Sequence, residues 1–134
     1  MHSIIQNCLH GDLSGVAEAA RSEGMTPEAL SRNIIAGRTI LLQNEAREYK
    51  PCAIGEGTSV KINVNIGTSG VTCDPAKEMK KAQAAIDNGA DAIMDLSTGG
   101  DLTAIRKEIL KLGIPVGTVP LLRSGTDVQE TLST

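Results

Sequence analysis

The sequence predicts an α/β fold in which a mainly helical N-terminal segment, residues 1–50, is followed by parallel βαβαβ units in residues 51–134. Three patterns predict it. Apolar and polar residues alternate over residues 60–69, which is typical of a strand whose two faces meet different surroundings. A strand, a loop and a helix then recur over roughly 25 to 30 residues, the length of a βα unit. Capping residues and glycines separate the helices from their neighbours, so the strands are expected to be parallel and joined by right-handed crossovers.

Residues 1–50 are expected to form short helices and one strand. Asp12 suits the N-cap of a helix that begins at Leu13. In the next helix Thr26 supplies the capping hydroxyl and Pro27 takes the first helical position. The expected elements are helices over 4–10, 13–23 and 26–36 and a strand over 38–42, with 44–50 left unassigned.

From residue 51 onward the strands alternate with helices. Asp74 and Asp101 are the expected caps of two helices, and a tight turn at Gly55–Gly57 precedes the first strand of the alternation. Because ligands of parallel sheets bind at the carboxyl ends of strands, three loops form the expected functional edge. The expected elements are strands over 60–66, 92–96 and 114–119, helices over 75–88, 102–112 and 127–132, and edge loops over 67–70, 97–100 and 118–120.

Composition narrows the function classes. The 134 residues are about one domain, with a net charge of −3 and neither Trp nor Phe, so the core is expected to be aliphatic. Interspersed charges are unlike the basic surface of a nucleic-acid binder. With no signal sequence and no apolar run that could span a membrane, we expect a cytoplasmic protein without a membrane partner. Cys8, Cys52 and Cys73 form no C-x-x-C pair, which argues against a disulfide framework or a metal site made by this chain.

Polar residues on two of the predicted strands are candidate site residues. Asn63 and Asn65 share one face, and an unpaired carboxamide in a core costs roughly 1 to 3 kcal/mol. They therefore predict either hydrogen bonds within a buried network or a ligand. Asp95 stands in an otherwise apolar strand, so it requires partial solvation or a partner such as Lys61 on the adjacent strand.

Other candidates have competing interpretations. Met94 on a strand is, by residue type, a core residue. Ser97–Gly100 at a helix start could cradle a phosphate with backbone N–H groups, although Asp101 as the helix cap competes for the same donors. Cys73 is expected to be structural, because no base is near it in the sequence. We assign no catalytic residue and no metal ligand in this chain.

Four motifs together resemble a known family. They read G-E-G at 55–57, V-K-I-N-V-N-I-G-T-S at 60–69, G-A-D-A-I-M-D-L-S-T-G-G at 89–100 and I-P-V-G-T-V-P at 114–120. In order and spacing they closely resemble phosphomethylpyrimidine synthase, the radical S-adenosylmethionine enzyme of thiamin biosynthesis. The resemblance covers most of the chain.

The resemblance implies a (β/α)8 barrel, of which this chain carries an incomplete portion. It implies a carbon–carbon lyase that converts aminoimidazole ribonucleotide to hydroxymethylpyrimidine phosphate with a 4Fe-4S cluster, S-adenosylmethionine and a zinc-type metal ion, whose ligands are absent from this chain. Asn65 and Met94 match the family's substrate-contacting residues. By the same resemblance the rim of the pocket is expected to include Asn63, Ser97, Thr98 and Gly99.

The sequence also departs from the family. Leu122 stands where the family has a substrate-contacting Tyr, and the chain ends after three barrel strands. We therefore expect a chain that is inactive alone and that assembles as a homo-oligomer, such as a homodimer, or with the remainder of the enzyme. Two alternatives stay open: 5-hydroxybenzimidazole synthase of the cobalamin lower-ligand pathway, and a non-catalytic relative that binds a partner or a nucleotide.

Overall fold

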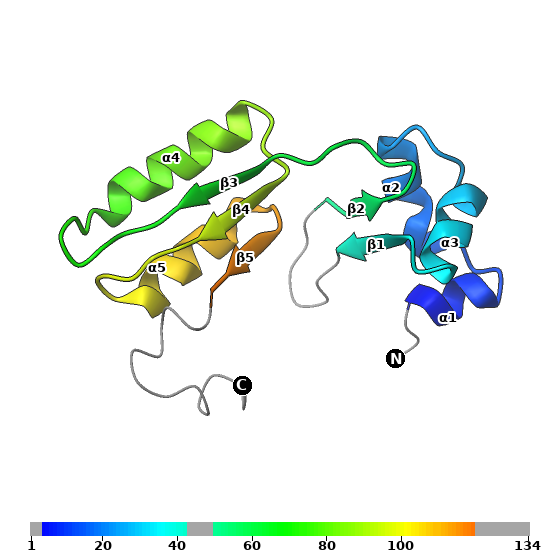
Figure 1. The fold of residues 1–134 in the computed structure, drawn as a ribbon, viewed down its shortest axis with the longest axis horizontal. Coiled ribbons are helices and arrows are strands. Elements are labelled where there is room, and N and C mark those ends of the chain that lie inside the picture. The colour runs from blue at the N-terminus through cyan, green and yellow to red at the C-terminus, as the bar shows by residue number, and fades with distance from the viewer. Residues whose placement is uncertain (1–3, 43–49, 120–134) are drawn as a thin grey trace. The chain divides into compact units, whose positions relative to one another are not determined.

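The computed structural model describes residues 4–42 and 50–119 and divides into two compact units, Met1–Lys61 and Ile62–Thr134 (Figure 1). The predicted helix over 127–132, the departure at Leu122 and most of the unassigned segment 44–50 lie outside the described residues. No helix in the described part of the chain is long and apolar enough to cross a membrane.

The first unit is a small helical layer with a two-stranded sheet. Its core contains Val16, Ala20, Leu30 and Ala53, so helices and sheet share one apolar cluster. The strands pair antiparallel, with Thr39 opposite Gly55. The elements are α1 Ile4–Leu9, the 3-10 turn η1 Ser14–Val16, α2 Ala17–Ser22, α3 Pro27–Ile35, β1 Thr39–Leu42 and β2 Cys52–Gly55.

Local capping explains where these helices begin. Thr26 Oγ1 accepts the N–H of Ala29 at 3.2 Å, as the sequence predicts. Asp12 acts differently from the prediction, because its Oδ1 accepts the N–H and the hydroxyl of Ser14, two residues on. The segment after it therefore starts as a 3-10 turn and becomes α-helical only at Ala17.

A nearly buried ion pair joins Lys61, the last residue of the first unit, to Glu23 at the end of α2. Lys61 Nζ lies 2.9 Å from Glu23 Oε1, and the two side chains are 11% and 6% exposed. Glu23 Oε2 accepts the N–H and the hydroxyl of Ser59 at 2.8 and 2.9 Å. Burial raises the pKa of the Glu23 carboxyl, but these hydrogen bonds and the Lys61 charge outweigh burial, so the pKa lies below its ordinary value of 4.5.

This pKa shift predicts a loss of stability in acid. A carboxyl whose folded pKa is depressed stabilises the fold above its unfolded pKa, and the contribution disappears as the pH falls through the folded pKa. We expect the first unit to lose stability below about pH 4.5 more steeply in the natural chain than in Glu23→Gln. Denaturant unfolding between pH 6 and 3, followed by NMR signals of the first unit, measures the difference. Parallel pH curves for the two proteins would contradict the prediction.

The second unit is a three-stranded parallel sheet, and it confirms the predicted βαβαβ order. The strand order is β3-β4-β5, with every described pair parallel. Asp74 and Asp101 cap the two helices, accepting the N–H groups of Lys77 and Ala104. The elements are β3 Asn63–Ile66, α4 Pro75–Asp87, β4 Ala92–Asp95, α5 Leu102–Ile109, the 3-10 turn η2 Leu110–Leu112 and β5 Val116–Thr118.

Strand β3 is shorter than the sequence predicts. Pairing begins at Asn63 opposite Ala92, whereas Val60 is 93% and Ile62 is 54% exposed. The Asp91 carboxylate marks this boundary, because its Oδ2 accepts the N–H of Ile62 at 2.7 Å. The alternation of apolar and polar residues thus extends beyond the paired strand.

The two faces of the sheet differ. Val64, Ile66, Ile93 and Val116 pack with α4 and α5 residues such as Ile105 in one apolar cluster, which makes this side the helix face. Neighbouring parallel strands place register partners on the same side. The opposite side, here called the amide face, comprises Asn63, Asn65, Ala92, Met94 and Gly117. Within residues 62–119 both helices lie on the helix face, and none covers the amide face (Figure 1).

Candidate functional site

The amide face brings the two predicted substrate residues together. Asn65 is the register partner of Met94, and Met94 is in turn the partner of Gly117. Adjacent strands of a sheet lie about 4.8 Å apart, so these residues form one row across β3, β4 and β5. Asn65 is exposed and Met94 is half-buried. The row lies close to the carboxyl ends of the strands, the edge where ligands of parallel sheets bind.

The carboxamides of Asn63 and Asn65 are open to solvent. Both side chains are exposed, and Asn63 Nδ2 donates to Asn65 Oδ1 at 3.2 Å. That bond runs along one strand, so the alternative of a buried hydrogen-bond network is wrong for the second unit. No charged side chain belongs to the amide face, which offers amide groups and a thioether.

Two loops at the carboxyl edge hold each other through what we call the loop clasp, formed by Thr68, Ser97, Thr98 and Gly99. The Thr68 N–H donates to Ser97 Oγ at 3.2 Å, and the Thr68 hydroxyl donates to the Gly99 carbonyl at 2.6 Å. In return, the Thr98 N–H donates to the Thr68 carbonyl at 2.8 Å. The loops that follow β3 and β4 are therefore locked together.

The loop clasp changes the interpretation of the predicted rim. Ser97 and Gly99 are buried within it, and only Thr98 among the three is exposed. The alternative in which Asp101 caps the helix is confirmed, since Asp101 Oδ1 accepts the Ala104 N–H at 2.9 Å. With the Thr98 N–H also bonded inside the loop clasp, fewer donors remain for a phosphate than the sequence predicts.

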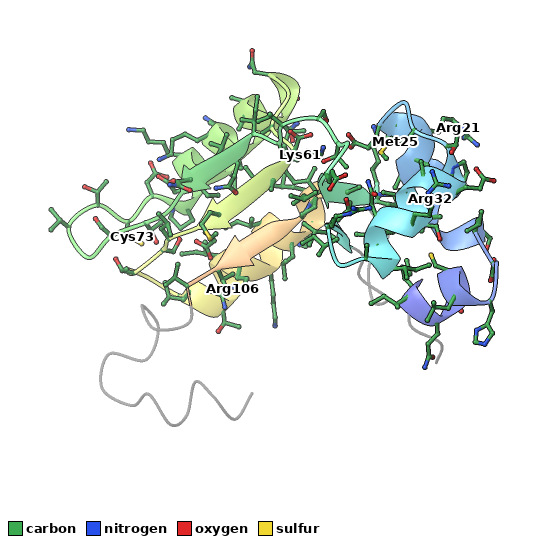
Figure 2. The ribbon with its side chains drawn as sticks, turned by 45° about the vertical axis from the view of Figure 1, so that its right-hand side comes forward. Arg21, Met25, Arg32, Lys61, Cys73 and Arg106 are labelled. Carbon is green, nitrogen blue, oxygen red and sulfur yellow. The ribbon has the colours of Figure 1, made fainter. Side chains whose placement is uncertain are left out.

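Asp95 has a different partner from the one predicted. It is 3% exposed, and its Oδ2 lies 3.6 Å from Nε of Arg106. Arg106 belongs to α5 and is labelled in Figure 2. Its Oδ1 accepts the Ser97 N–H at 3.0 Å, which ties the carboxylate to the loop clasp. The prediction of Lys61 as partner is wrong, because Lys61 pairs with Glu23 in the first unit.

Glu78 is a second buried carboxylate that sequence reasoning missed. Its Oε2 accepts the Gly67 N–H at 2.8 Å, directly after β3, and its Oε1 lies 2.7 Å from Lys81 Nζ. Helical spacing is the sequence signal that could have found it, since Glu78 precedes the buried Ala82 by four residues and so lies on the same side of α4. Glu78 therefore fixes the start of the loop after β3.

The described residues do not fit the two metal-containing cofactors that the resemblance implies, the 4Fe-4S cluster and the zinc-type ion. Within residues 4–42 and 50–119, no group of three or more His, Cys, Asp or Glu side chains could hold a metal ion. Cys8 and Cys52 are buried in the first unit, and Cys73 is an exposed thiol whose Sγ lies against Gly100 (Figure 2). We therefore derive no chemical step through an iron–sulfur cluster or a zinc-type ion.

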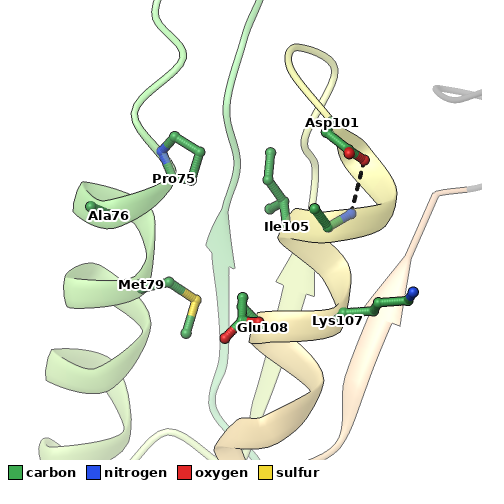
Figure 3. A pocket seen from close by; sticks show the side chains of 8 residues that line it. Pro75, Ala76, Met79, Asp101, Ile105, Lys107 and Glu108 are labelled. Atoms are coloured by element: carbon green, nitrogen blue, oxygen red, sulfur yellow. Dashed lines mark hydrogen bonds between the residues drawn. The ribbon is translucent and has the colours of Figure 1, made fainter.

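A groove lies on the helix side of the second unit. It has a volume of about 450 Å³ between α4 and α5, with Met79 and Ile105 at its apolar floor (Figure 3). Asp101, Lys107 and Glu108 contribute its charged lining. Since these residues belong to α4 and α5 or, as Asp101 does, cap α5, the groove is separate from the amide face.

Comparison with known proteins matches nearly the whole chain. A family model described as the Radical SAM ThiC family matches residues 4–133. The chain is 44% identical over 129 residues to the phosphomethylpyrimidine synthase of Methanopyrus kandleri, and this alignment covers 94% of this chain and 30% of that protein. It is 49% identical over 107 residues to the enzyme of that name from Thermodesulfovibrio yellowstonii, covering 79% of this chain and 25% of the relative. The chain thus spans less than a third of the length of these relatives.

Proposed function

This chain belongs to the Radical SAM ThiC family, and from that membership we propose that it acts in thiamin biosynthesis as part of a phosphomethylpyrimidine synthase. The reaction is the conversion of aminoimidazole ribonucleotide to hydroxymethylpyrimidine phosphate by radical S-adenosylmethionine chemistry. The relatives described above carry the name of this enzyme, which favours it over 5-hydroxybenzimidazole synthase. The contribution of this chain is one wall of the ribonucleotide pocket.

The proposed wall is the amide face, and the second unit is proposed to be part of a (β/α)8 barrel. In such barrels the helices form an outer ring and the opposite face of the sheet points to the interior. The placement of α4 and α5 on the helix face alone supports this arrangement.

The single observation that carries the proposal is the register that sets Asn65 beside Met94 on an uncovered face. A carboxamide donates and accepts hydrogen bonds, so it suits the ring nitrogens or ribose hydroxyls of a ribonucleotide. A thioether next to a flat ring is favourable by about 0.3 to 1.5 kcal/mol. Because the amide face has no charged group, it is proposed to contact the ring and the ribose, while the phosphate binds elsewhere.

Titration calorimetry with aminoimidazole ribonucleotide tests the proposal. We expect the natural chain to bind and Asn65→Ala to bind about tenfold more weakly, the effect of losing one hydrogen bond of about 1.4 kcal/mol. Asn88→Ala is the matched control, because Asn88 is exposed at the C-terminal end of α4 and donates to the Ala84 carbonyl. Equal affinities for Asn65→Ala and Asn88→Ala, or no binding by the natural chain, would contradict the proposal.

A further inference from the structure

Gly117 and Met94 are in direct contact on the amide face. They are register partners on β5 and β4. A Cβ atom added to Gly117 would lie 2.9 Å from Cε and 3.1 Å from Sδ of Met94. Such distances are shorter than ordinary contacts between carbon atoms, which are about 3.5 to 4.0 Å. The end of the Met94 side chain therefore occupies the space that a side chain at position 117 would take.

This contact decides where the thioether lies. Met is unbranched, with three rotatable bonds, so its position depends on the space its neighbours leave. With glycine at 117, the Met94 side chain lies across β5 and is half-buried, while Asn65 on the other side of it stays exposed. The surface beside Asn65 is therefore open, with the sulfur at its border.

We propose that Gly117 is a specificity-determining position, because it sets the place of the Met94 thioether and thereby the space in which a flat heteroaromatic ring lies beside Asn65. This inference deepens the proposed function and rests on it. A side chain at 117 displaces the sulfur from β5, so the ring loses its contact with the thioether and part of its space. The ribose and the phosphate of the ligand are unaffected, since they do not depend on the thioether.

The substitution Gly117→Ala tests the inference with little risk to the fold, because the group it displaces is the end of a flexible side chain. We expect the Met94 methyl resonance to shift, while the methyl resonances of Met25 and Met79 stay in place. We expect affinity for aminoimidazole ribonucleotide to fall about tenfold and affinity for ribose 5-phosphate, which has no ring, to stay constant. Gly15→Ala is the matched control, because a Cβ there meets only ordinary contacts with Ile4.

A double-mutant cycle separates action through Met94 from a general structural effect. In a Met94→Ala background, we expect Gly117→Ala to have no further effect on ribonucleotide affinity. An unmoved Met94 methyl resonance, or an equal loss of affinity in both backgrounds, would overturn the inference. If the natural chain binds neither compound, the proposed function fails and the ring-recognition role fails with it. The Met94 resonance then still decides whether Gly117 positions the thioether.

Discussion

Replacing Gly99 by alanine is expected to open the loop clasp and to loosen the carboxyl edge of the sheet. A Cβ atom at Gly99 would lie 2.3 Å from the Ser69 carbonyl oxygen and 2.4 Å from its carbon. These are backbone atoms, which cannot rotate away as a side chain can, so the two loops must separate. We expect a cost of about 3 to 4 kcal/mol, from overpacking and from the lost hydrogen bond between Thr68 and Gly99.

Amide hydrogen exchange measures this effect at the site itself. The Thr98 N–H, which donates to the Thr68 carbonyl, is expected to exchange at least about 100-fold faster in Gly99→Ala, since each 1.4 kcal/mol is tenfold. Gly70→Ala is the matched control in the neighbouring loop, because a Cβ there has no atom within 4 Å. Equal Thr98 protection in the two variants would show that the loop clasp does not depend on close backbone packing.

Removing the Asp95 carboxylate is expected to destabilise the second unit by about 3 kcal/mol. Removing one partner of a buried ion pair costs about 3 to 5 kcal/mol of stability. The lower end of this range applies here because the Arg106 side chain is 19% exposed to solvent. Asp95→Ala also leaves the Ser97 N–H without its acceptor. The N–H of Ile93, a fully buried residue of the central strand, donates to the Pro115 carbonyl and so reports the unfolding of this unit by hydrogen exchange.

Two further variants separate the charge from the hydrogen bond. Asp95→Asn keeps an oxygen for the Ser97 N–H and removes only the charge that faces Arg106, so a smaller loss is expected. Asp91→Ala removes a carboxylate that accepts a backbone N–H at the opposite, amino edge of the same sheet. It is expected to leave the exchange of Ser97 and Thr98 unchanged. If Asp95→Ala and Asp91→Ala speed the hydrogen exchange of the Ile93 N–H equally, the ion pair between Asp95 and Arg106 makes no specific contribution to the stability of the second unit, which would contradict the prediction.

The helices could be predicted because their signals are local. A cap and the N–H that it accepts are two or three residues apart, and the caps at Thr26, Asp74 and Asp101 are visible in the sequence. The two faces of β3 were predictable for the same reason, since side chains alternate along a strand. Both features depend on neighbouring residues alone.

The partners of buried charges could not be predicted, because they are set by packing between distant segments. Lys61 and Arg106 are both basic, and nothing local indicates that Arg106 reaches Asp95 from α5. The burial of Ser97 and Gly99 likewise depends on the loop after β3, about 30 residues away. The start of β3 was also predicted too early, because the alternation of apolar and polar residues begins at Val60, whereas pairing with β4 begins only at Asn63.

The most direct test of the central claim, that the amide face is a ribonucleotide surface, is a crystal structure of the chain with aminoimidazole ribonucleotide. The prediction is a ring that contacts the Met94 thioether, with the Asn65 carboxamide hydrogen-bonded to the ring or the ribose. A nucleotide bound in the groove between α4 and α5, or on the first unit, with Asn65 and Met94 untouched, would contradict it.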